Sequence, residues 1–364
     1  MKILIVQQKM IGDVLTSTIL CEQIKKNVPG SQVHYLINEN TMAVVANNPY
    51  IDQTVLFKQE HRNNKIALYR FLKTIRKERY DVVIDVYSKL ESMLITLFSG
   101  ANIKISYYKW YSRPIYTHTH KYIRSGKTRL GLAIENRLAL LSPILPIDGL
   151  RVGPPKIYLE PTETEAAKAF LIKKGIDFSK PNLMINILGS NPNKTYPPAY
   201  MAAILDRIAQ RLPSNILFNY IPSQIADVQE VYGLCAPTTQ QMIRLDVFAP
   251  SLRSFLGLLT HCNALLGNEG GGVNMAKALN LPTFSIFSPW VTKVAWEIFP
   301  ENKMNKAVHL GDFLPEHFQN RSVKQLRDTS EELLYPLFVP SLIIDQLDHF
   351  LSETVFATHK LPEK

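Results

Sequence analysis

The residues best suited to binding an anion stand at a glycine-rich turn in the second half of the chain. An apolar run ends at Leu266, then come Gly270, Gly271 and Gly272, and a helical pattern continues to Leu279 before another apolar run. Adjacent glycines let the backbone approach a ligand without a Cβ, and a helix N-terminus offers unpaired N–H groups. The turn is therefore a candidate site for a diphosphate. The alternative interpretation is a tight turn that only reverses the chain.

Polar side chains near this turn, and after another apolar run, extend the candidate site. Lys194 follows the run Leu183–Ile187, with Ser190 four residues before it. An ammonium after a sheet strand suits a leaving diphosphate whose charge grows during a reaction, although most loop lysines are merely solvated. Glu269 and Asn274 flank the glycines. They could contact sugar and ribose hydroxyls, or they could cap the turn.

The sequence predicts neither a metal nor a cofactor. No DxD triplet occurs, so a divalent metal that would carry a diphosphate has no evident ligand set. Cys21, Cys235 and Cys262 are far apart and form no CxxC, which argues against a zinc site and against a disulfide framework. No apolar run approaches the ~18 residues of a membrane-spanning helix. We expect a cytoplasmic protein, at most resting on a membrane.

A basic, aromatic segment covers residues 103–129 and contains no acidic residue. Aromatic rings stack on sugars while Arg and Lys pair with phosphates, so the segment is a candidate platform for an anionic glycan. The alternative is a solvated strand and loop. The residues predicted to contact such a glycan, which would be the acceptor if the protein is a transferase, are Lys109, Arg113, Lys121 and Arg124. The net charge of +10 also fits an anionic membrane or nucleic acid, but no helix-turn-helix, RNA-binding or zinc pattern supports the latter.

The elements that must position these residues are strands alternating with helices. Apolar runs and helical patterns alternate from Ile3 onward, which predicts parallel sheets covered on both faces. A proline-rich stretch around 150–161 reads as a linker in a chain of 364 residues, too long for one typical core. We expect domains at 1–155 and 156–340, with a C-terminal helix at 341–357 that joins the first domain.

Three motifs carry a resemblance to a known family. They are IGDVLT at residues 11–16, GS at 189–190 with KTYP at 194–197, and EGGGVN at 269–274 followed by AKAL. Their order and spacing resemble those of the lipopolysaccharide heptosyltransferases, glycosyltransferase family 9. The resemblance implies an α/β protein of GT-B type, with two doubly wound Rossmann-like domains facing a cleft.

The resemblance also implies roles for individual residues. The enzyme would be an inverting, metal-independent glycosyltransferase that uses a nucleotide-diphosphate sugar, ADP-heptose by analogy, to extend a lipopolysaccharide core or related lipid-linked glycan. Asp13, otherwise a helix cap, would be the general base, the N-terminal domain would bind the acceptor, and the C-terminal domain the donor. The residues implied to bind the donor are Gly12, Ser190, Lys194, Glu269, Gly270, Gly271, Gly272 and Asn274.

Departures from the family pattern keep two alternatives open. Gln7, Glu269, Gly270 and Asn274 stand where the family usually has Arg, Asp, Thr and His. The chain could be a glycosyltransferase with another donor sugar, or a non-catalytic nucleotide-sugar-binding protein. A dehydrogenase is disfavoured because the first strand lacks GxGxxG. The sequence leaves the exact donor, the acceptor and the oligomeric state open.

Overall fold

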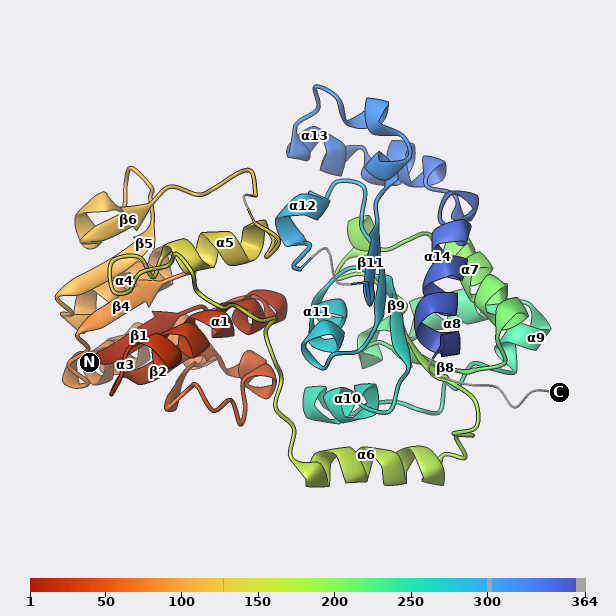
Figure 1. Cartoon of the computed structure of the whole chain (residues 1–364), viewed down its shortest axis with the longest axis horizontal. Coiled ribbons are helices and arrows are strands. Elements are labelled where there is room, and N and C mark those ends of the chain that lie inside the picture. The colour runs from red at the N-terminus through yellow and green to blue at the C-terminus, as the bar shows by residue number, and fades with distance from the viewer. Residues whose placement is uncertain (127, 300–302, 358–364) are drawn as a thin grey trace. The chain divides into compact units, whose positions relative to one another are not determined.

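The structure, a computed structural model, describes residues 1–126, 128–299 and 303–357. The chain divides into two compact units, which are described separately (Figure 1). The first comprises Met1–Tyr158 with Val294–Phe299, and the second begins at Leu159 and holds the remaining residues. The predicted boundary at 155 lies close to this division, but the return of Val294–Phe299 to the first unit has no signal in the sequence.

The first unit is built around a parallel sheet of 6 strands in the order β3-β2-β1-β4-β5-β6. Its strands are β1 (Lys2–Val6), β2 (Gln32–Asn38), β3 (Gln53–Phe57), β4 (Val82–Asp85), β5 (Ile103–Tyr107) and β6 (His118–His120). Its helices are α1 (Ile11–Asn27), α2 (Gln59–Asn63), α3 (Lys65–Lys77), α4 (Leu90–Ser99) and α5 (Leu132–Ala139), with the short 3-10 helices η1 (Glu39–Val44) and η2 (Arg113–Ile115). The short helix α12 (Lys293–Trp296) belongs to this unit from Val294 onward.

Burial explains why this sheet is covered on both faces. Residues Ile3 to Val6 of β1 are all fully buried, so both faces of the strand meet other elements. Leu4 and Val6 share a core with Phe71 and Leu72 of α3. Since side chains alternate along a strand, Ile3 and its alternate neighbours face the opposite side, where α1 and α5 pack together. The predicted doubly wound arrangement is thereby confirmed for this unit.

The second unit holds a parallel sheet of 5 strands in the order β11-β10-β9-β7-β8. Its strands are β7 (Asn182–Asn186), β8 (Asn215–Asn219), β9 (Ala264–Asn268), β10 (Thr283–Ile286) and β11 (Asn305–Val308). Its helices are α6 (Pro161–Lys173), α7 (Pro198–Arg211), α8 (Ile225–Leu234), α9 (Pro237–Gln240), α10 (Leu252–Leu259), α11 (Gly271–Ala278), α13 (Val323–Asp328) and α14 (Ile344–Phe350). The π-helical turns Ser330–Leu334 and Leu351–Phe356 precede and extend α14.

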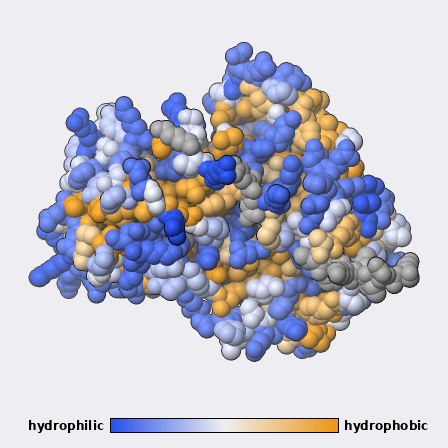
Figure 2. Space-filling view, viewed as in Figure 1, coloured by the Kyte–Doolittle hydropathy of each residue, from blue (hydrophilic) through white to orange (hydrophobic). Residues whose placement is uncertain are grey.

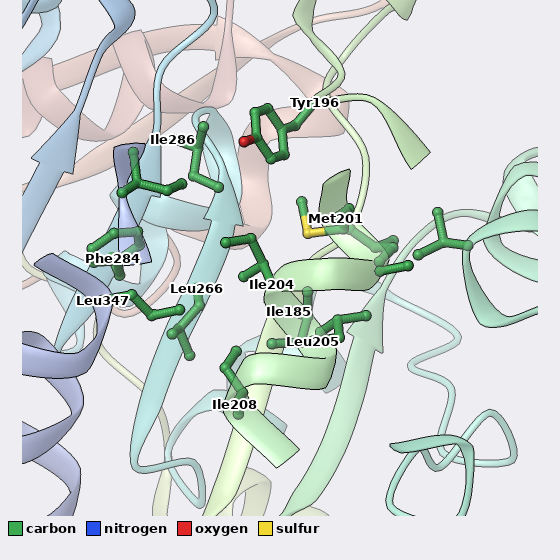
Figure 3. Close-up of a cluster of buried hydrophobic side chains, with 14 of the residues drawn as sticks. Ile185, Tyr196, Met201, Ile204, Leu205, Ile208, Leu266, Phe284, Ile286 and Leu347 are labelled. Atoms are coloured by element: carbon green, nitrogen blue, oxygen red, sulfur yellow. The ribbon is translucent and has the colours of Figure 1, made fainter. Parts of the chain in front are cut away.

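The C-terminal helix belongs to the second unit, contrary to the prediction that it joins the first. In Figure 3, Leu347 of α14 and the apolar side chains of α7, among them Leu205 and Ile208, point into one cluster beside Leu266 of β9. Arg207 of α7 also forms an ion pair with Asp348. The helix stays with the second unit because its apolar side chains are buried against α7 and the sheet of that unit.

The surface is mixed. Hydrophilic residues cover most of the face seen in Figure 2, with hydrophobic residues exposed between them. Within the described ranges, no helix has both the length and the apolar character needed to cross a membrane.

Candidate functional site

A candidate site in the first unit lies where the strand order reverses. Strands β1 and β4 are neighbours in the sheet. Gln7, which follows β1, and Val86 and Tyr87, which follow β4, line a cavity of about 270 Å³. Ligands of doubly wound sheets bind at this kind of position, beyond the carboxyl ends of the strands. The cavity therefore arises from the topology of the sheet.

Asp13 lines this cavity and is held by an arginine. It stands in the first turn of α1, and its Oδ1 accepts a hydrogen bond of 2.8 Å from Nη2 of Arg137. Arg137 also donates to the Ser17 hydroxyl at 2.9 Å and to the Ala133 carbonyl at 2.9 Å. A buried guanidinium with three such partners has a single orientation, so it fixes the carboxylate in turn.

The second carboxylate oxygen of Asp13 is less constrained. Oδ2 lies 3.4 Å from the amide nitrogen of Met10, a long contact compared with the usual ~2.9 Å of an N–H···O hydrogen bond. The helix-capping interpretation of Asp13 therefore has only weak support in this geometry. Oδ2 is the oxygen that can accept a proton from a bound hydroxyl.

Aromatic side chains form another wall of the same cavity. Tyr107 at the end of β5 and Tyr122 line it, with their rings 5.5 Å apart in an edge-to-face arrangement. Trp296, from the returning segment, also lines it and is half exposed. Faces of aromatic rings suit the C–H faces of a sugar, so the cavity combines a carboxylate with a surface suited to a saccharide.

The four basic residues predicted to contact an acceptor differ in their surroundings. Arg113, Lys121 and Arg124 are exposed. Lys109 is half-buried, and its Nζ donates a hydrogen bond to the carbonyl of Ser88. Lys121 and Arg124 lie on either side of Tyr122 in the sequence, whereas Lys109 ties the basic segment to the turn after β4.

A buried carboxyl group beneath this turn was not anticipated from the sequence. Asp85, the last residue of β4, is fully buried and accepts hydrogen bonds from the Tyr116 hydroxyl at 2.6 Å and the Ser88 amide at 2.7 Å. Burial raises the pKa of Asp85 to about 6, against the lowering effect of these hydrogen bonds and of Lys109. Through these hydrogen bonds Asp85 connects Tyr116, in the basic segment, to the turn Val86–Ser88. Val86 and Tyr87 of this turn line the cavity.

The raised pKa of Asp85 predicts how the stability of an Asp85→Asn variant depends on pH. Between pH ~4 and ~6 the folded protein holds a proton on Asp85 that the unfolded chain has released. The contribution of Asp85 to the stability of the fold is therefore full below pH ~4 and is lost as the pH rises through 6. Asparagine does not titrate. The quantity to measure is the unfolding free energy of the wild type minus that of the variant. This difference should fall by up to about 3 kcal/mol between pH 4 and 7.

Denaturant titrations across this pH range check the prediction. Asp148→Asn, which changes an exposed carboxylate of the same unit, is the matched control and should give a nearly constant difference. A constant difference for Asp85→Asn as well would show that the folded protein leaves the pKa of Asp85 at its ordinary value.

A candidate site in the second unit lies at its own reversal of strand order, between β7 and β9. Lys194, after β7, donates a hydrogen bond of 3.0 Å to Oε1 of Glu269, which directly follows β9. The Lys194 ammonium also lies 5.1 Å from the ring centre of Trp290. The structure thus brings together two of the residues predicted to bind the donor, and it adds an aromatic ring that holds the ammonium in place.

The glycine turn has the conformation that its sequence requires. Gly270 has φ of 148°, a region that residues with a side chain rarely adopt, and it precedes α11. A Cβ on Gly272 would lie 2.8 Å from Oδ1 of Asn186, so this glycine allows the helix to approach the end of β7. Asn274 is half-buried on the same helix. The N-terminal amides of α11 therefore begin at the carboxyl edge of the sheet, as an anion site requires.

A second cavity of about 400 Å³ adjoins the loop after β7. Ser190 and Thr195 line one side of it, and Gln224, Asp227 and Glu230, at and after the start of α8, line the other. Carboxylates accept hydrogen bonds from hydroxyl groups, so this cavity suits a polyhydroxylated group such as a ribose. The two acidic side chains were not singled out from the sequence.

The predicted donor residues do not all fall in one unit. Gly12 belongs to α1 of the first unit, and the others belong to the second. Sequence reasoning also missed Arg137 and Trp296 as cavity residues, and it did not single out Tyr107 within the aromatic segment 103–129. The positions of Arg137 and Trp296 carry no motif. Asp85 was also missed, although an aspartate at the end of an apolar run is a signal that the sequence does show. In the part of the chain that the structure describes, no three His, Cys, Asp or Glu side chains cluster as metal ligands would.

Comparison with known proteins yields matches over most of the chain. A family model described as glycosyltransferase family 9 (heptosyltransferase) matches residues 68–310. Lipopolysaccharide heptosyltransferase 1 of Campylobacter coli is 23% identical over 308 residues, which cover 79% of this chain and 84% of that protein.

Solved structures show the same fold. The glycosyl transferase family 9 protein from Veillonella parvula DSM 2008 superposes with a TM-score of 0.82 at 18% identity, covering 97% of this chain and 98% of the other. E. coli heptosyltransferase WaaC with ADP-2-deoxy-2-fluoro heptose has a TM-score of 0.67 at 13% identity, with coverages of 96% and 99%. The predicted GT-B fold, with its two parallel-sheet α/β units, is confirmed.

Proposed function

This chain belongs to glycosyltransferase family 9, the heptosyltransferase family, and from that premise we propose that it transfers a heptose-like sugar from a nucleotide-diphosphate donor, ADP-heptose, to a lipopolysaccharide core or related lipid-linked glycan. The observation that carries the proposal is the fixed carboxylate of Asp13 in a cavity lined by tyrosines. That arrangement suits activation of a saccharide hydroxyl. The solved structure of E. coli heptosyltransferase WaaC with ADP-2-deoxy-2-fluoro heptose supports this choice of donor.

The proposed step is a single displacement. Asp13 takes the proton of the acceptor hydroxyl through Oδ2, and the hydroxyl oxygen attacks the anomeric carbon as the bond from that carbon to the diphosphate oxygen breaks. Configuration at the sugar carbon inverts. Arg137 keeps Oδ1 occupied and so presents one oxygen of the carboxylate to the acceptor.

The departing diphosphate is proposed to be stabilised by the second unit. Lys194 and the N-terminal amides of α11, at Gly270 to Gly272, would interact with the growing negative charge. Glu269 and Asn274 would bind hydroxyls of the donor, and Ser190 with the cavity beside α8 would bind the nucleoside. We propose that no divalent metal or other cofactor takes part, because no DxD triplet is present and the lysine and amides supply positive charge.

A transfer assay tests this function. The purified protein is incubated with ADP-heptose and a heptose-deficient lipopolysaccharide core, and mass spectrometry should detect acceptor that has gained one heptose, with or without EDTA. Product that forms only from another nucleotide sugar would change the donor. Donor binding without transfer to any glycan extract from the protein's own cells would favour a non-catalytic binding protein.

The alternatives rest on specific residues. Glu269, Gly270 and Asn274 differ from the family pattern at the positions proposed to meet the donor. A larger acidic side chain and a lost hydroxyl alter hydrogen bonding to a sugar without removing the helix N-terminus that suits a diphosphate. Of the two alternatives, these differences therefore favour a transferase with another donor sugar over a protein that has lost nucleotide-diphosphate binding.

The acceptor is proposed to lie along the basic segment beside the cavity. Charge reversal at Lys121 and Arg124, both exposed and adjacent to Tyr122, should raise the KM for the acceptor while leaving the donor KM nearly unchanged. Exposed charges are screened over ~8 Å at physiological salt, so the wild-type acceptor KM should also rise with salt. Steady-state kinetics with either substrate varied checks this, with Lys168→Glu on α6 as the control charge reversal. Equal changes in both KM values would mean that the segment has a structural role.

A further inference from the structure

Helix α4 follows strand β4 in the first unit (Figure 1). Its polar and apolar side chains have an unusual distribution. Its buried side carries Ser92, Thr96 and Ser99 beside Met93 and Ile95. The three hydroxyls donate to carbonyls of the preceding turn, with Thr96 bonded to Ser92 at 2.8 Å and Ser99 to Thr96 at 2.7 Å. Three of the five buried residues of this helix are therefore polar, and their hydroxyls are hydrogen-bonded within the helix and its first turn.

The outward side of α4 is apolar instead. Leu90, Leu97 and Phe98 are 73%, 48% and 41% exposed, and their spacing of seven and eight residues puts them on one helical face. A helix that faces water normally has the reverse pattern, with apolar residues inward. This outward face is consequently suited to an apolar medium.

An aromatic turn lies beside helix α4. Lys109 donates a hydrogen bond to the carbonyl of Ser88, two residues before α4, and η2 packs against the helix. Between these anchors Trp110 is 80% exposed and Tyr111 56% exposed, with their rings 5.8 Å apart. Tryptophan and tyrosine are the residues enriched at the boundary between lipid and water.

The charges around this face are basic. Lys89 and Arg113 are exposed beside it, and the acid-free segment 103–129 continues from it. The acidic residue of the helix, Glu91, is neutralised by two hydrogen bonds of 2.6 and 2.9 Å from Arg62. An apolar face with a basic border fits an anionic lipid surface.

We propose that this face, named here the α4 face (Leu90, Leu97, Phe98, Trp110 and Tyr111), docks the protein on an anionic lipid bilayer. Its apolar and aromatic side chains enter the boundary between headgroups and acyl chains, while Arg113 and Lys89 meet lipid phosphates. A second copy of the chain fits less well, because a two-fold interface through this face would bring the same basic residues together. Docking goes beyond the proposed transfer, although it would bring the Asp13 cavity of the same unit near a lipid-linked acceptor.

Vesicle binding by the full chain tests the proposal without donor or acceptor, so its failure would leave the transferase proposal standing. Wild type should co-sediment with vesicles of phosphatidylglycerol and phosphatidylcholine but hardly with pure phosphatidylcholine, and salt should weaken the binding. Brominated acyl chains should quench fluorescence in wild type and much less in Trp110→Phe.

Two variants and two matched controls localise the contact. Leu97→Ser with Phe98→Ser should weaken vesicle binding about tenfold or more, since two exposed side chains no longer enter the bilayer. Arg113→Glu should weaken it at least about fivefold. Ile172→Ser and Lys168→Glu alter an equally exposed isoleucine and an exposed lysine of α6, and both should bind vesicles as wild type does.

Three results would overturn the proposal. One is vesicle binding that does not respond to the α4-face variants or to lipid charge. Another is a wild-type dimer, measured by light scattering, that dissociates in the Leu97→Ser, Phe98→Ser variant, since it would assign the face to a second copy. The third is a change in Trp110 fluorescence that a soluble anionic oligosaccharide produces as fully as vesicles without bromine do.

Discussion

Replacement of Asp13 by asparagine is expected to lower the rate of sugar transfer by ~10²–10⁴-fold, the usual contribution of a general base. Asparagine keeps the size of the side chain and can still accept a hydrogen bond from Arg137 through its carbonyl oxygen. The contact with the Met10 amide is long, so little capping is lost. The loss should therefore appear in the rate at saturating substrates, with donor affinity nearly intact.

Two measurements separate basicity from structure in this experiment. Calorimetric binding of ADP-heptose should be the same for wild type and Asp13→Asn, and thermal unfolding should differ little. Arg137→Gln is the informative companion variant: it keeps the base but removes its fixed orientation, so it should lower the rate less than Asp13→Asn does. Transfer by Asp13→Asn at nearly the wild-type rate would make Asp13 a structural residue and place the base elsewhere.

Replacement of Lys194 by alanine is expected to weaken binding of ADP by roughly tenfold to 150-fold, corresponding to the ~1.5–3 kcal/mol of a charged hydrogen bond. Adenosine binding should change little, because the proposed contact is with phosphate. The structure adds a second reason for the loss. Glu269, whose side chain is only 12% exposed, would be left without its 3.0 Å ammonium partner and would repel the diphosphate.

A double-mutant cycle distinguishes the two contributions. Glu269→Gln removes the repulsion, so the combined Lys194→Ala, Glu269→Gln variant should bind ADP better than Lys194→Ala alone. Lys180→Ala, an exposed lysine of the same unit, is the control and should bind ADP as wild type does. Unchanged ADP affinity in Lys194→Ala would mean that Lys194 serves only to pair with Glu269.

Local patterns in the sequence were sufficient for the fold class and for the strand ends that carry the candidate residues. Continuous apolar runs predicted strands where β1, β7 and β9 are found, and the glycines predicted the turn before α11. These features are local, because burial on both faces of a parallel strand demands an apolar run and a φ of 148° demands glycine. The motifs also predicted the family that the comparison shows.

Tertiary structure alone decided which groups meet. Arg137 reaches Asp13 across 124 residues of sequence, and Tyr107 reaches their cavity because β5 lies beside β4 in the sheet. The C-terminal helix shows the same limit: the sequence predicted the helix, but which unit buries it depends on packing against α7. The sequence thus determined which surfaces must be buried and which residues could react, and long-range packing chose their partners, since apolar attraction has no direction of its own.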